Sequence, residues 1–389
     1  MSKLDELIAE FCPDGVEYRR VGDIADYEQP SKYLVKSTDY NDNFEIPVLT
    51  AGQTFILGYT NEKEGIYNAS PEKPVIIFDD FTGAFKWVDF PFKAKSSAMK
   101  MITSKSDVLI RYLYHLMGFL NYSSDEHKRL WISVYSELQV PVPHLEVQRE
   151  IVHILDSFTL LTAELTAELT ARKKQYEFYR DNLIKKEQHI SEVKKLADVA
   201  NIYDSLHQTP SYSNSGYSMV RVQDIKGGYV DEDKTLKVDE SVWNLFTQKY
   251  TPRLNDIVVS RVGSYGNFAL IPNDKCCLGQ NVALIHPNIN PKYLYHVLMS
   301  TMTKQWINNN VKGASQKSFS LADIKRVPVP VPKENIQQRI AEVLDNFEAI
   351  CTDLNIGLPA EIEARQKQYE YYRDLLLTFA ETGSTLMTD

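Results

Sequence analysis

The sequence predicts an α+β protein: two mixed α/β domains joined by two long antiparallel coiled-coil helices, with internal pseudo-two-fold symmetry. Residues 140–158 recur at 329–347 with nine of nineteen positions identical, and residues 172–184 recur at 365–377 with nine of thirteen identical. Residues 140–158 and their copy 329–347 both begin with Val-Pro-Val-Pro, a segment that favours an extended backbone and disfavours a helix. Two blocks repeated in the same order indicate a duplicated unit of one domain followed by one helix.

We expect the domain boundaries beside the two Val-Pro-Val-Pro stretches. They divide the 389 residues into a first domain (1–145), a central helix (146–190), a second domain (191–330) and a C-terminal helix (331–389). A chain of this length can bury more than one core. With 43% hydrophobic and 24% charged residues, it has the composition of a globular protein rather than a disordered one.

The chain shows no targeting or membrane signal. No run approaches 18 apolar residues, so no membrane span or membrane partner is expected. The first ten residues carry acidic side chains within their apolar pattern, unlike a signal peptide. Cys12, Cys276, Cys277 and Cys351 have no metal-ligand spacing, and the adjacent pair is not expected to form a disulfide. A cytoplasmic location is therefore predicted.

Both repeated blocks have the heptad spacing of helices that pack along other helices. From Ile151 to Leu183 the apolar positions step by four and three. About 40 residues at about 1.5 Å each make a rod of about 60 Å. The second block has an extra four residues around Gly357 and Pro359, where we expect the helix to break or kink.

The order of the segments predicts how the helices run. The first helix leads from domain one into domain two, and the second leaves domain two. If they pack together they are antiparallel, and the chain returns to domain one with two near-identical ends. Two copies of one partner could dock there. The candidate partner-binding residues at the helix ends are Tyr176, Tyr179, Arg180, Tyr369, Tyr372 and Arg373. The alternative is a coiled coil that only dimerises.

A shorter repeat lies inside the first helix, where Thr-Ala-Glu-Leu at 162–165 recurs at 166–169. One such unit changes the rod by four residues, about 6 Å and about one turn. A base pair spans about 3.4 Å, so the repeat number could set a spacing on DNA. The alternative is a helix-forming sequence that slipped during replication.

Both domains are predicted to mix strands with one helix. In the first domain we expect strands at 46–52, 74–80 and 96–102 and a helix at 105–120; in the second, strands at 219–225, 256–262 and 281–287 and a helix at 293–308. Outside the framing segments the two domains barely match. A shared frame with unlike interiors suggests one task performed on two different ligands.

Basic, amide and aromatic residues in corresponding loops are the DNA-binding candidates. Lysine and arginine neutralise phosphate, and arginine, glutamine and asparagine can read base edges. In the first domain the candidates are Lys32, Tyr33, Lys36, Lys86, Trp87, Lys93, Lys95, Lys128, Arg129 and Trp131. In the second domain they are Arg261, Ser264, Tyr265, Gln280, Asn281, Lys312, Ser315, Gln316 and Lys317. Each residue alone could be an ordinary solvated surface group.

Charge and missing motifs limit the function. The net charge is −9, although residues 191–330 carry +4, so DNA binding would need local basic patches and a partner. No methyl-transfer or phosphate-cradling motif is present, and the eight histidines lack metal-ligand spacing. Glu232-Asp233-Lys234 fits a nuclease tripeptide only formally. We therefore expect no catalytic site, metal or cofactor in this chain.

The repeated blocks resemble the specificity subunit of type I restriction–modification systems, HsdS, and the Thr-Ala-Glu-Leu tandem looks like its type IC branch. The loops beginning at His127 and Gly313 are similar to its target-recognition segments. The resemblance covers nearly the whole chain. It implies a non-enzymatic subunit that reads a split site on double-stranded DNA, one domain for each half, with the helices setting the gap.

The same resemblance implies partners that carry the chemistry. Two methyltransferase (HsdM) subunits would bind S-adenosylmethionine and methylate adenine, and restriction (HsdR) subunits could add ATP- and Mg²⁺-dependent cleavage. Two rival hypotheses stay open at this point. One is a coiled-coil interaction scaffold that never touches nucleic acid, which the acidic total favours. The other is a stand-alone nuclease.

Overall fold

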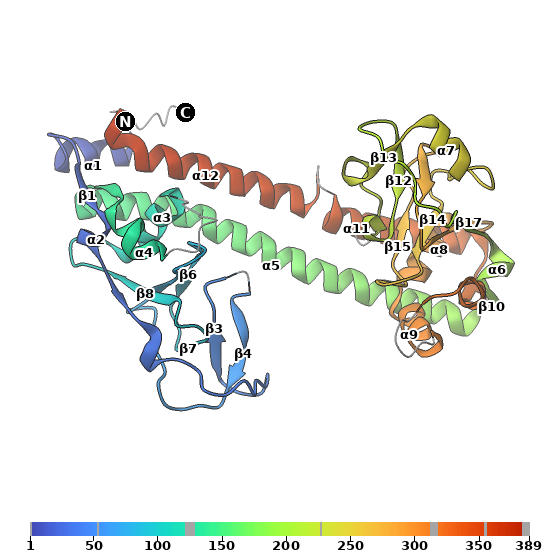
Figure 1. Ribbon diagram of the computed structural model, residues 1–389, viewed down its shortest axis with the longest axis horizontal. Coiled ribbons are helices and arrows are strands. Elements are labelled where there is room, and N and C mark those ends of the chain that lie inside the picture. Colours follow the sequence, from blue (N-terminus) through green and yellow to red (C-terminus); the bar gives the residue numbers. More distant parts are fainter. Residues whose placement is uncertain are drawn as a thin grey trace. The chain divides into compact units, whose positions relative to one another are not determined.

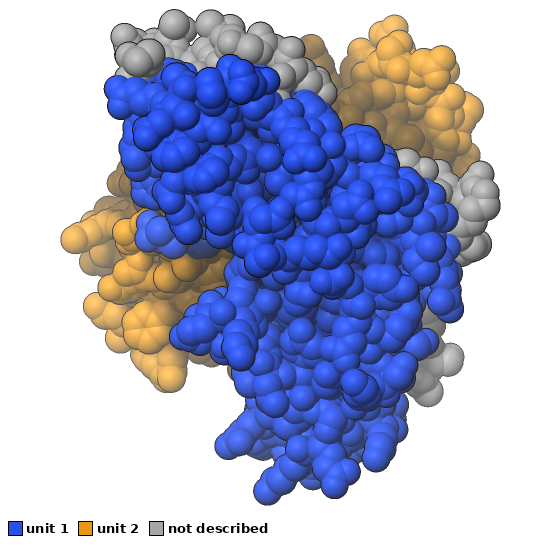
Figure 2. Space-filling view, turned by 90° about the vertical axis from the view of Figure 1, so that its left-hand side faces the viewer, with its two compact units in different colours: residues 1–164, 362–389 blue, residues 165–361 orange. Residues whose placement is uncertain are grey.

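The computed structural model describes residues 2–52, 54–120, 129–225, 228–311, 318–353 and 356–382. The chain forms two compact units, coloured separately in Figure 2: unit 1 is residues 1–164 with 362–389, and unit 2 is residues 165–361. Leu376, Leu377 and Phe379 lie in the core of unit 1. The predicted return of the C-terminal helix to the first domain is therefore confirmed.

The long helices follow the repeated blocks. Helix α5 (Leu145–Ile190) is one uninterrupted helix of 46 residues, whereas the second block is divided into α11 (Glu334–Thr352) and α12 (Leu358–Thr382) (Figure 1). A Cβ at Gly357 would lie 2.6 Å from the carbonyl oxygen of Asp353, so the turn between the two helices requires glycine. Pro359 sits in the first turn of α12, where it is tolerated. The predicted break is confirmed.

Aromatic pairs show how the helices pack within each unit. In unit 1, Phe158 of α5 stacks on Tyr372 of α12 with centroids 5.1 Å apart. In unit 2, Tyr179 of α5 packs against Phe347 of α11 at 5.6 Å. Each pair joins the phenylalanine that ends one copy of the 140–158 repeat to a tyrosine in one copy of the 172–184 repeat. The partners follow opposite orders along the two helices, as antiparallel packing requires.

The Val-Pro-Val-Pro stretches form edge strands. β9 (Gln139–Val142) pairs antiparallel with β1 (Glu17–Arg20), and β18 (Pro328–Val331) pairs in the same way with β10 (Glu192–Lys195). Proline lacks an N–H, so it suits two-stranded sheets of this kind. Both ribbons lead directly into the long helices.

The two domains share one strand order. Unit 1 has an antiparallel sheet β2-β8-β5-β6 and a small sheet β4-β3-β7; unit 2 has β11-β17-β14-β15 and β13-β12-β16. Counted along the chain, the described strands of unit 1 have counterparts in unit 2 in the same order, and β3–β7 and β12–β16 are the parallel strand pairs among them. The weak sequence similarity of the domains had concealed this identity of topology.

The bounds of the remaining elements follow the predictions in part. The strands of unit 1 are β2 (Ala25–Glu28), β3 (Ile46–Leu49), β4 (Ile56–Thr60), β5 (Val75–Asp79), β6 (Phe85–Val88), β7 (Lys93–Ala94) and β8 (Met99–Ser104). Those of unit 2 are β11 (Ala200–Asp204), β12 (Tyr217–Val220), β13 (Leu236–Val238), β14 (Ile257–Ser260), β15 (Phe268–Leu270), β16 (Cys276–Leu278) and β17 (Val282–Pro287). The short helices are α1 (Lys3–Phe11), α2 (Val21–Ile24), α3 (Ile110–Leu120), α4 (Leu130–Ser133), α6 (Leu196–Val199), α7 (Glu240–Phe246), α8 (Pro291–Met299), α9 (Thr301–Asn310) and α10 (Leu321–Arg326).

Two sequence predictions were wrong in detail. The helix expected over 293–308 is interrupted at Ser300, whose extended backbone (φ −65°, ψ 152°) ends α8 and whose hydroxyl accepts from the Thr303 N–H to begin α9. The strand expected over 219–225 ends at Val220, because residues 222–225 form a 3₁₀ turn. Among the described helices, none is long and apolar enough to cross a membrane.

Candidate nucleic-acid interface and the domain–helix junctions

In each unit a buried histidine connects the domain to the two long helices. In unit 1, His115 of α3 lies 2.9 Å from Asp156 of α5 through Nε2 and 3.0 Å from the Tyr369 hydroxyl of α12 through Nδ1. In unit 2, His296 of α8 makes the matching contacts, 2.8 Å to Asp345 and 3.0 Å to Tyr176. Both imidazoles are fully buried. The repeated Tyr-Leu-Tyr-His, Leu-Asp and Gln-Tyr segments therefore meet at one point in each unit.

Cations and glutamines complete both junctions. Arg111 donates to Asp156 at 2.7 Å, and Lys292 donates to Asp345 at 2.6 Å. Gln148 and Gln337 each donate to a proline carbonyl of the preceding Val-Pro-Val-Pro segment at 2.8 Å. Their side-chain oxygens accept from backbone N–H groups of Leu109 and Asn290, at 2.9 and 3.1 Å. The residues that recur in the sequence are those that hold the domain against its helices.

The junction carboxylates are held ionised. Burial alone would raise the pKa of Asp156, but hydrogen bonds from His115 and Arg111 bring that pKa below its ordinary value. His296 and Lys292 have the same effect on the pKa of Asp345. Burial lowers the pKa of His115, which favours the neutral ring. The consistent assignment has Nε2–H donating to aspartate and Nδ1 accepting from the tyrosine hydroxyl.

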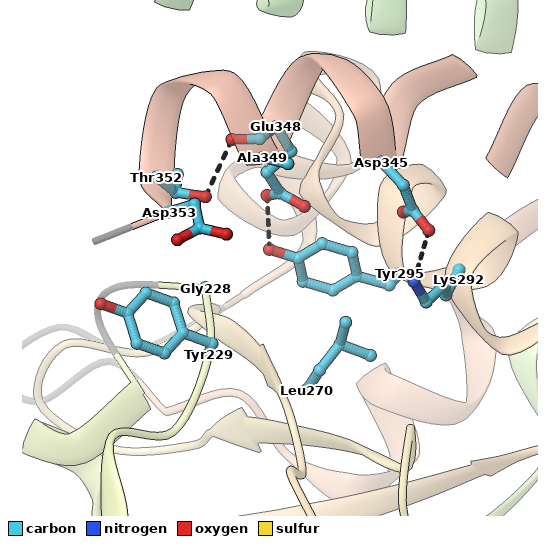
Figure 3. A pocket seen from close by; sticks show the side chains of 10 residues that line it. All are labelled: Gly228, Tyr229, Leu270, Lys292, Tyr295, Asp345, Glu348, Ala349, Thr352 and Asp353. Atoms are coloured by element: carbon cyan, nitrogen blue, oxygen red, sulfur yellow. Dashed lines mark hydrogen bonds and ion pairs between the residues drawn. The ribbon is translucent and has the colours of Figure 1, made fainter. Parts of the chain in front are cut away.

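A hollow opens beside each junction. The one in unit 2 has a volume of about 420 Å³ and is lined by the Lys292–Asp345 pair, Tyr295 and Glu348, with Tyr229 below (Figure 3). Burial raises the pKa of Glu348, whose carboxylate accepts from the Tyr295 hydroxyl at 3.0 Å. The counterpart in unit 1 is about 570 Å³. Its lining residues include Arg111, Asp156, Thr159 and Leu160. There Thr159 takes the repeat position of Glu348.

His296, Asp345 and Glu348 bring ligand atoms within 4.8 Å of one another, a spacing compatible with a metal ion. However, both nitrogens of His296 have hydrogen-bond partners, and Lys292 already neutralises Asp345. A cation would have to displace these contacts. The cluster is better explained as the structural junction of unit 2.

The structure changes the set of helix-end residues. Tyr176 and Arg180 are 8% and 3% exposed, so their proposed place on a partner surface was wrong: Tyr176 holds His296, and the Arg180 guanidinium lies 5.3 Å from the Tyr176 ring centre. Tyr369 holds His115, and Tyr372 stacks on Phe158. The side chain of Arg373 lies over the Tyr369 ring at 5.7 Å.

Two aromatic residues near the helix ends that were not predicted from the sequence are largely exposed. Phe178 and Tyr371 are each 64% exposed and occupy the same position of the repeated block. Tyr179 is 43% exposed but packs on Phe347. The usable signal was helical phase, because residues 178 and 371 lie two positions from the buried tyrosines and hence on the opposite side of the helix.

The DNA candidates of unit 1 divide into exposed and internal groups. Lys32, Lys36, Lys95 and Arg129 are exposed. Lys93 was a wrong prediction: it is 1% exposed, and its ammonium lies 2.9 Å from Glu62 and donates to the Glu64 carbonyl. Trp131 was also wrong, because it is 2% exposed and packs against Phe78.

Three further candidates of unit 1 are partly buried. Tyr33 donates to Glu28 at 3.2 Å and packs edge-on to Tyr67. Lys86 and Trp87 lie on β6, where the Arg111 guanidinium covers the Trp87 ring at 4.8 Å. They are available only in part for a nucleic acid.

In unit 2, Arg261 forms an ion pair with Asp204, so its positive charge is balanced within the domain. Ser264 and Gln280 are exposed, and Tyr265 is partly buried against the core. Asn281 adopts a positive φ of 64°. The remaining candidates lie outside the described residues: Lys128, Lys312, Ser315, Gln316 and Lys317.

The chain is similar in sequence to a known protein family. The family described as Type I restriction modification DNA specificity domain matches residues 13–172 and 190–364. The chain belongs to this family. It is 44% identical over 401 residues to the specificity subunit of a type I restriction enzyme from Escherichia coli, covering 97% of both chains. It is therefore a type I specificity subunit with two target recognition domains.

Solved structures agree on the fold. A type I specificity subunit from M. genitalium aligns with a TM-score of 0.53 at 12% identity, covering 94% of this chain and 96% of that one. A chain from a structural study of complex assembly and conformational transition in the type I system aligns with a TM-score of 0.51 at 15% identity, covering 95% and 98%. Each match takes in one target recognition domain and a long part of the helical segment that follows it: the first ends within α5, and the second covers α11 and ends near the beginning of α12.

Proposed function

We propose that this chain gives a type I restriction–modification complex its DNA sequence specificity, with each domain reading one half of a split site. The observation that carries this proposal is the pairing of one strand order with two different sets of loop side chains. A constant frame positions both domains in the same way on their helices. The differing residues can then recognise different bases.

Two copies of one methyltransferase subunit are the proposed partners. Each unit offers a hollow beside its junction and one aromatic on the adjoining helix, Tyr371 in unit 1 and Phe178 in unit 2, at equal exposure. Repeated surfaces on a single chain suit two identical partners, as the two faces of a symmetric dimer would. Exposed aromatics surrounded by polar residues are common anchors of protein interfaces. Restriction subunits would join through the same assembly.

The chemistry is proposed to lie in the partners. S-adenosylmethionine, ATP and Mg²⁺ would be bound by the methyltransferase and restriction subunits, and this chain would be non-catalytic. Among the described residues, the cluster of His296, Asp345 and Glu348 is engaged in hydrogen bonds of the unit 2 junction. Because the net charge is −9, we expect weak DNA binding by the chain alone and tight binding by the assembly.

The test is a mobility-shift assay on the purified complex with its methyltransferase, using duplexes that carry both half-sites, one half-site or neither. We expect tight binding only when both half-sites are present. The rival scaffold function would be favoured by an assembled complex that binds all three duplexes equally, or none of them.

A further inference from the structure

A small groove in unit 2 lies at the carboxyl ends of the two parallel strands. Arg221 follows β12 directly, and Gly279 and Gln280 follow β16. The groove has a volume of about 230 Å³, and its lining includes these three residues together with Tyr212 and Gln223. Ligands of sheets that contain parallel strands commonly bind beyond the carboxyl ends of those strands. Gln280 is one of the candidates predicted from the sequence, whereas Arg221 is not.

Arg221 is held in one orientation at this groove. Its Nε and Nη2 donate to the two oxygens of Asp224 at 3.0 and 3.1 Å, and its backbone N–H donates to the same carboxylate at 2.9 Å. Asp224 is itself almost fully buried. A guanidinium has five N–H groups, so three remain after the contacts with Asp224, including one on each terminal nitrogen that point forward together.

The side-chain amide of Gln223 lies at that forward edge. With the Gln223 side chain turned so that its oxygen faces the guanidinium, the oxygen accepts from Nη2 at 2.6 Å and from Nη1 at 3.1 Å. A single acceptor thus takes both N–H groups. Guanine presents two acceptors, O6 and N7, at the spacing of these two donors. The base would make one straight hydrogen bond with each nitrogen, where Gln223 offers one shared oxygen.

The backbone around the groove is shaped to bring Arg221 close to β16. A Cβ at Gly279 would lie 3.1 Å from Cγ of Arg221 and 3.2 Å from the Val220 carbonyl oxygen, so a side chain there would push the arginine aside. Two residues on, Asn281 holds a φ of 64°, in the left-handed region that asparagine adopts more readily than most side chains.

We propose that Arg221 reads a guanine in the half-site recognised by unit 2, with Asp224 fixing its orientation and Gln223 giving way to the base. This inference rests on the proposed DNA-reading function and assigns one base contact within it. The Arg221 side chain is only 23% exposed and its charge is balanced by Asp224, which distinguishes it from the freely exposed lysines suited to phosphate. Gln280 is exposed beside it and can contact the neighbouring base pair.

Arg253 provides a matched control in the same domain. Its backbone N–H also donates to a carboxylate three residues on, Asp256, at 2.8 Å. Its guanidinium lies over the Tyr250 ring at 5.6 Å and is not part of the groove. Arg253→Ala removes the same side chain from a similar turn, so it reports the effect of losing one positive charge from unit 2.

The experiment selects bound duplexes from a random pool with the assembled methyltransferase complex, using the wild type, Arg221→Ala, Arg221→Lys and Arg253→Ala. We expect the wild type to recover a split motif. Arg221→Ala should lose the preference for one guanine in one half by roughly 5- to 150-fold. Arg221→Lys should weaken the same preference, because lysine lacks the planar fork of donors that Asp224 orients. The other half of the motif and the Arg253→Ala motif should be unchanged.

The outcomes separate this inference from the function on which it rests. If the wild-type complex recovers no motif, the proposed function fails. If the wild type recovers a split motif and Arg221→Ala keeps every base of it, the guanine contact is wrong. A uniform loss of affinity without a change in motif would make Arg221 a phosphate contact and overturn the inference as well. Thermal denaturation of each variant shows whether it folds. If an Arg221 variant does not fold, Gln223→Ala replaces it in the test: this change exposes the forward edge of the Arg221 guanidinium and should strengthen the guanine preference.

Discussion

Replacing His115 with leucine tests whether the junction of unit 1 is held by its hydrogen bonds. The change keeps a buried side chain of similar volume and removes the contacts with Asp156 and Tyr369. A hydrogen bond to a charged partner contributes about 1.5–3 kcal/mol and one to a neutral partner about 0.5–1.5 kcal/mol. The Asp156 side chain is 38% exposed and keeps Arg111, so the lower part of the first range applies. We expect a loss of about 2–3 kcal/mol.

The assay is urea denaturation followed by circular dichroism, with amide hydrogen exchange to localise the effect. Because Tyr369 anchors α12, exchange over residues 362–379 should accelerate in His115→Leu, while β14 and β17 of unit 2 stay protected. His153→Leu is the matched control, since His153 lies on α5 and is exposed; it should change stability by no more than about 0.5 kcal/mol. Equal effects of the two substitutions would refute the hydrogen-bonded junction.

Three further predictions follow from the same structure. Lowering the pH from about 6.5 should destabilise unit 1, because burial lowers the folded-state pKa of His115 and the unfolded chain then binds the proton more readily. The depressed pKa of Asp156 extends this loss of stability below about pH 4. A pH series of melting curves in which the stabilities of the wild type and His115→Leu fall in parallel would contradict this prediction. Phe178→Ser and Tyr371→Ser should each weaken binding of the methyltransferase at least about fivefold, as measured by calorimetry. The control Leu254→Ser, which changes a residue of unit 2 with a matching exposure of 65%, should leave this binding unchanged. A similar loss in all three variants would attribute the effect to general surface hydrophobicity. Deleting residues 166–169 shortens α5 by about 6 Å, against about 3.4 Å per base pair, and should reduce the preferred gap between half-sites by about one to two base pairs. An unchanged gap in the selected motif would rule out the spacing role of the helix.

Much of the architecture could be predicted from the sequence because it is repeated. The Val-Pro-Val-Pro strands, the return of the chain to unit 1 and the break at Gly357 all follow from comparing one half with the other. The shared strand order of the domains could not be predicted, because strands are specified by burial patterns that many different sequences satisfy. The interruption at Ser300 depends on one side chain that can either continue a helix or cap the next one.

The candidate sites were less predictable, because residue type does not determine which way a side chain points. Lys93 and Trp131 have the chemistry of nucleic-acid contacts, but both side chains are buried: Lys93 forms an ion pair with Glu62, and Trp131 packs against Phe78. His115 and His296 could not be recognised as junction residues from the sequence, because their aspartate and tyrosine partners lie on helices distant along the chain. Arg221 was overlooked because its role depends on Asp224 and on a strand about 60 residues further along the chain.

The central claim is that one chain reads two different DNA half-sites through two copies of one frame. It is tested most directly by mapping adenine methylation in a genome whose cell expresses this chain with its methyltransferase. We expect a single split motif with two specified halves and a fixed unspecified gap, and we expect this methylation to be lost when the chain is deleted. A continuous motif, or methylation that persists unchanged without this chain, would contradict it.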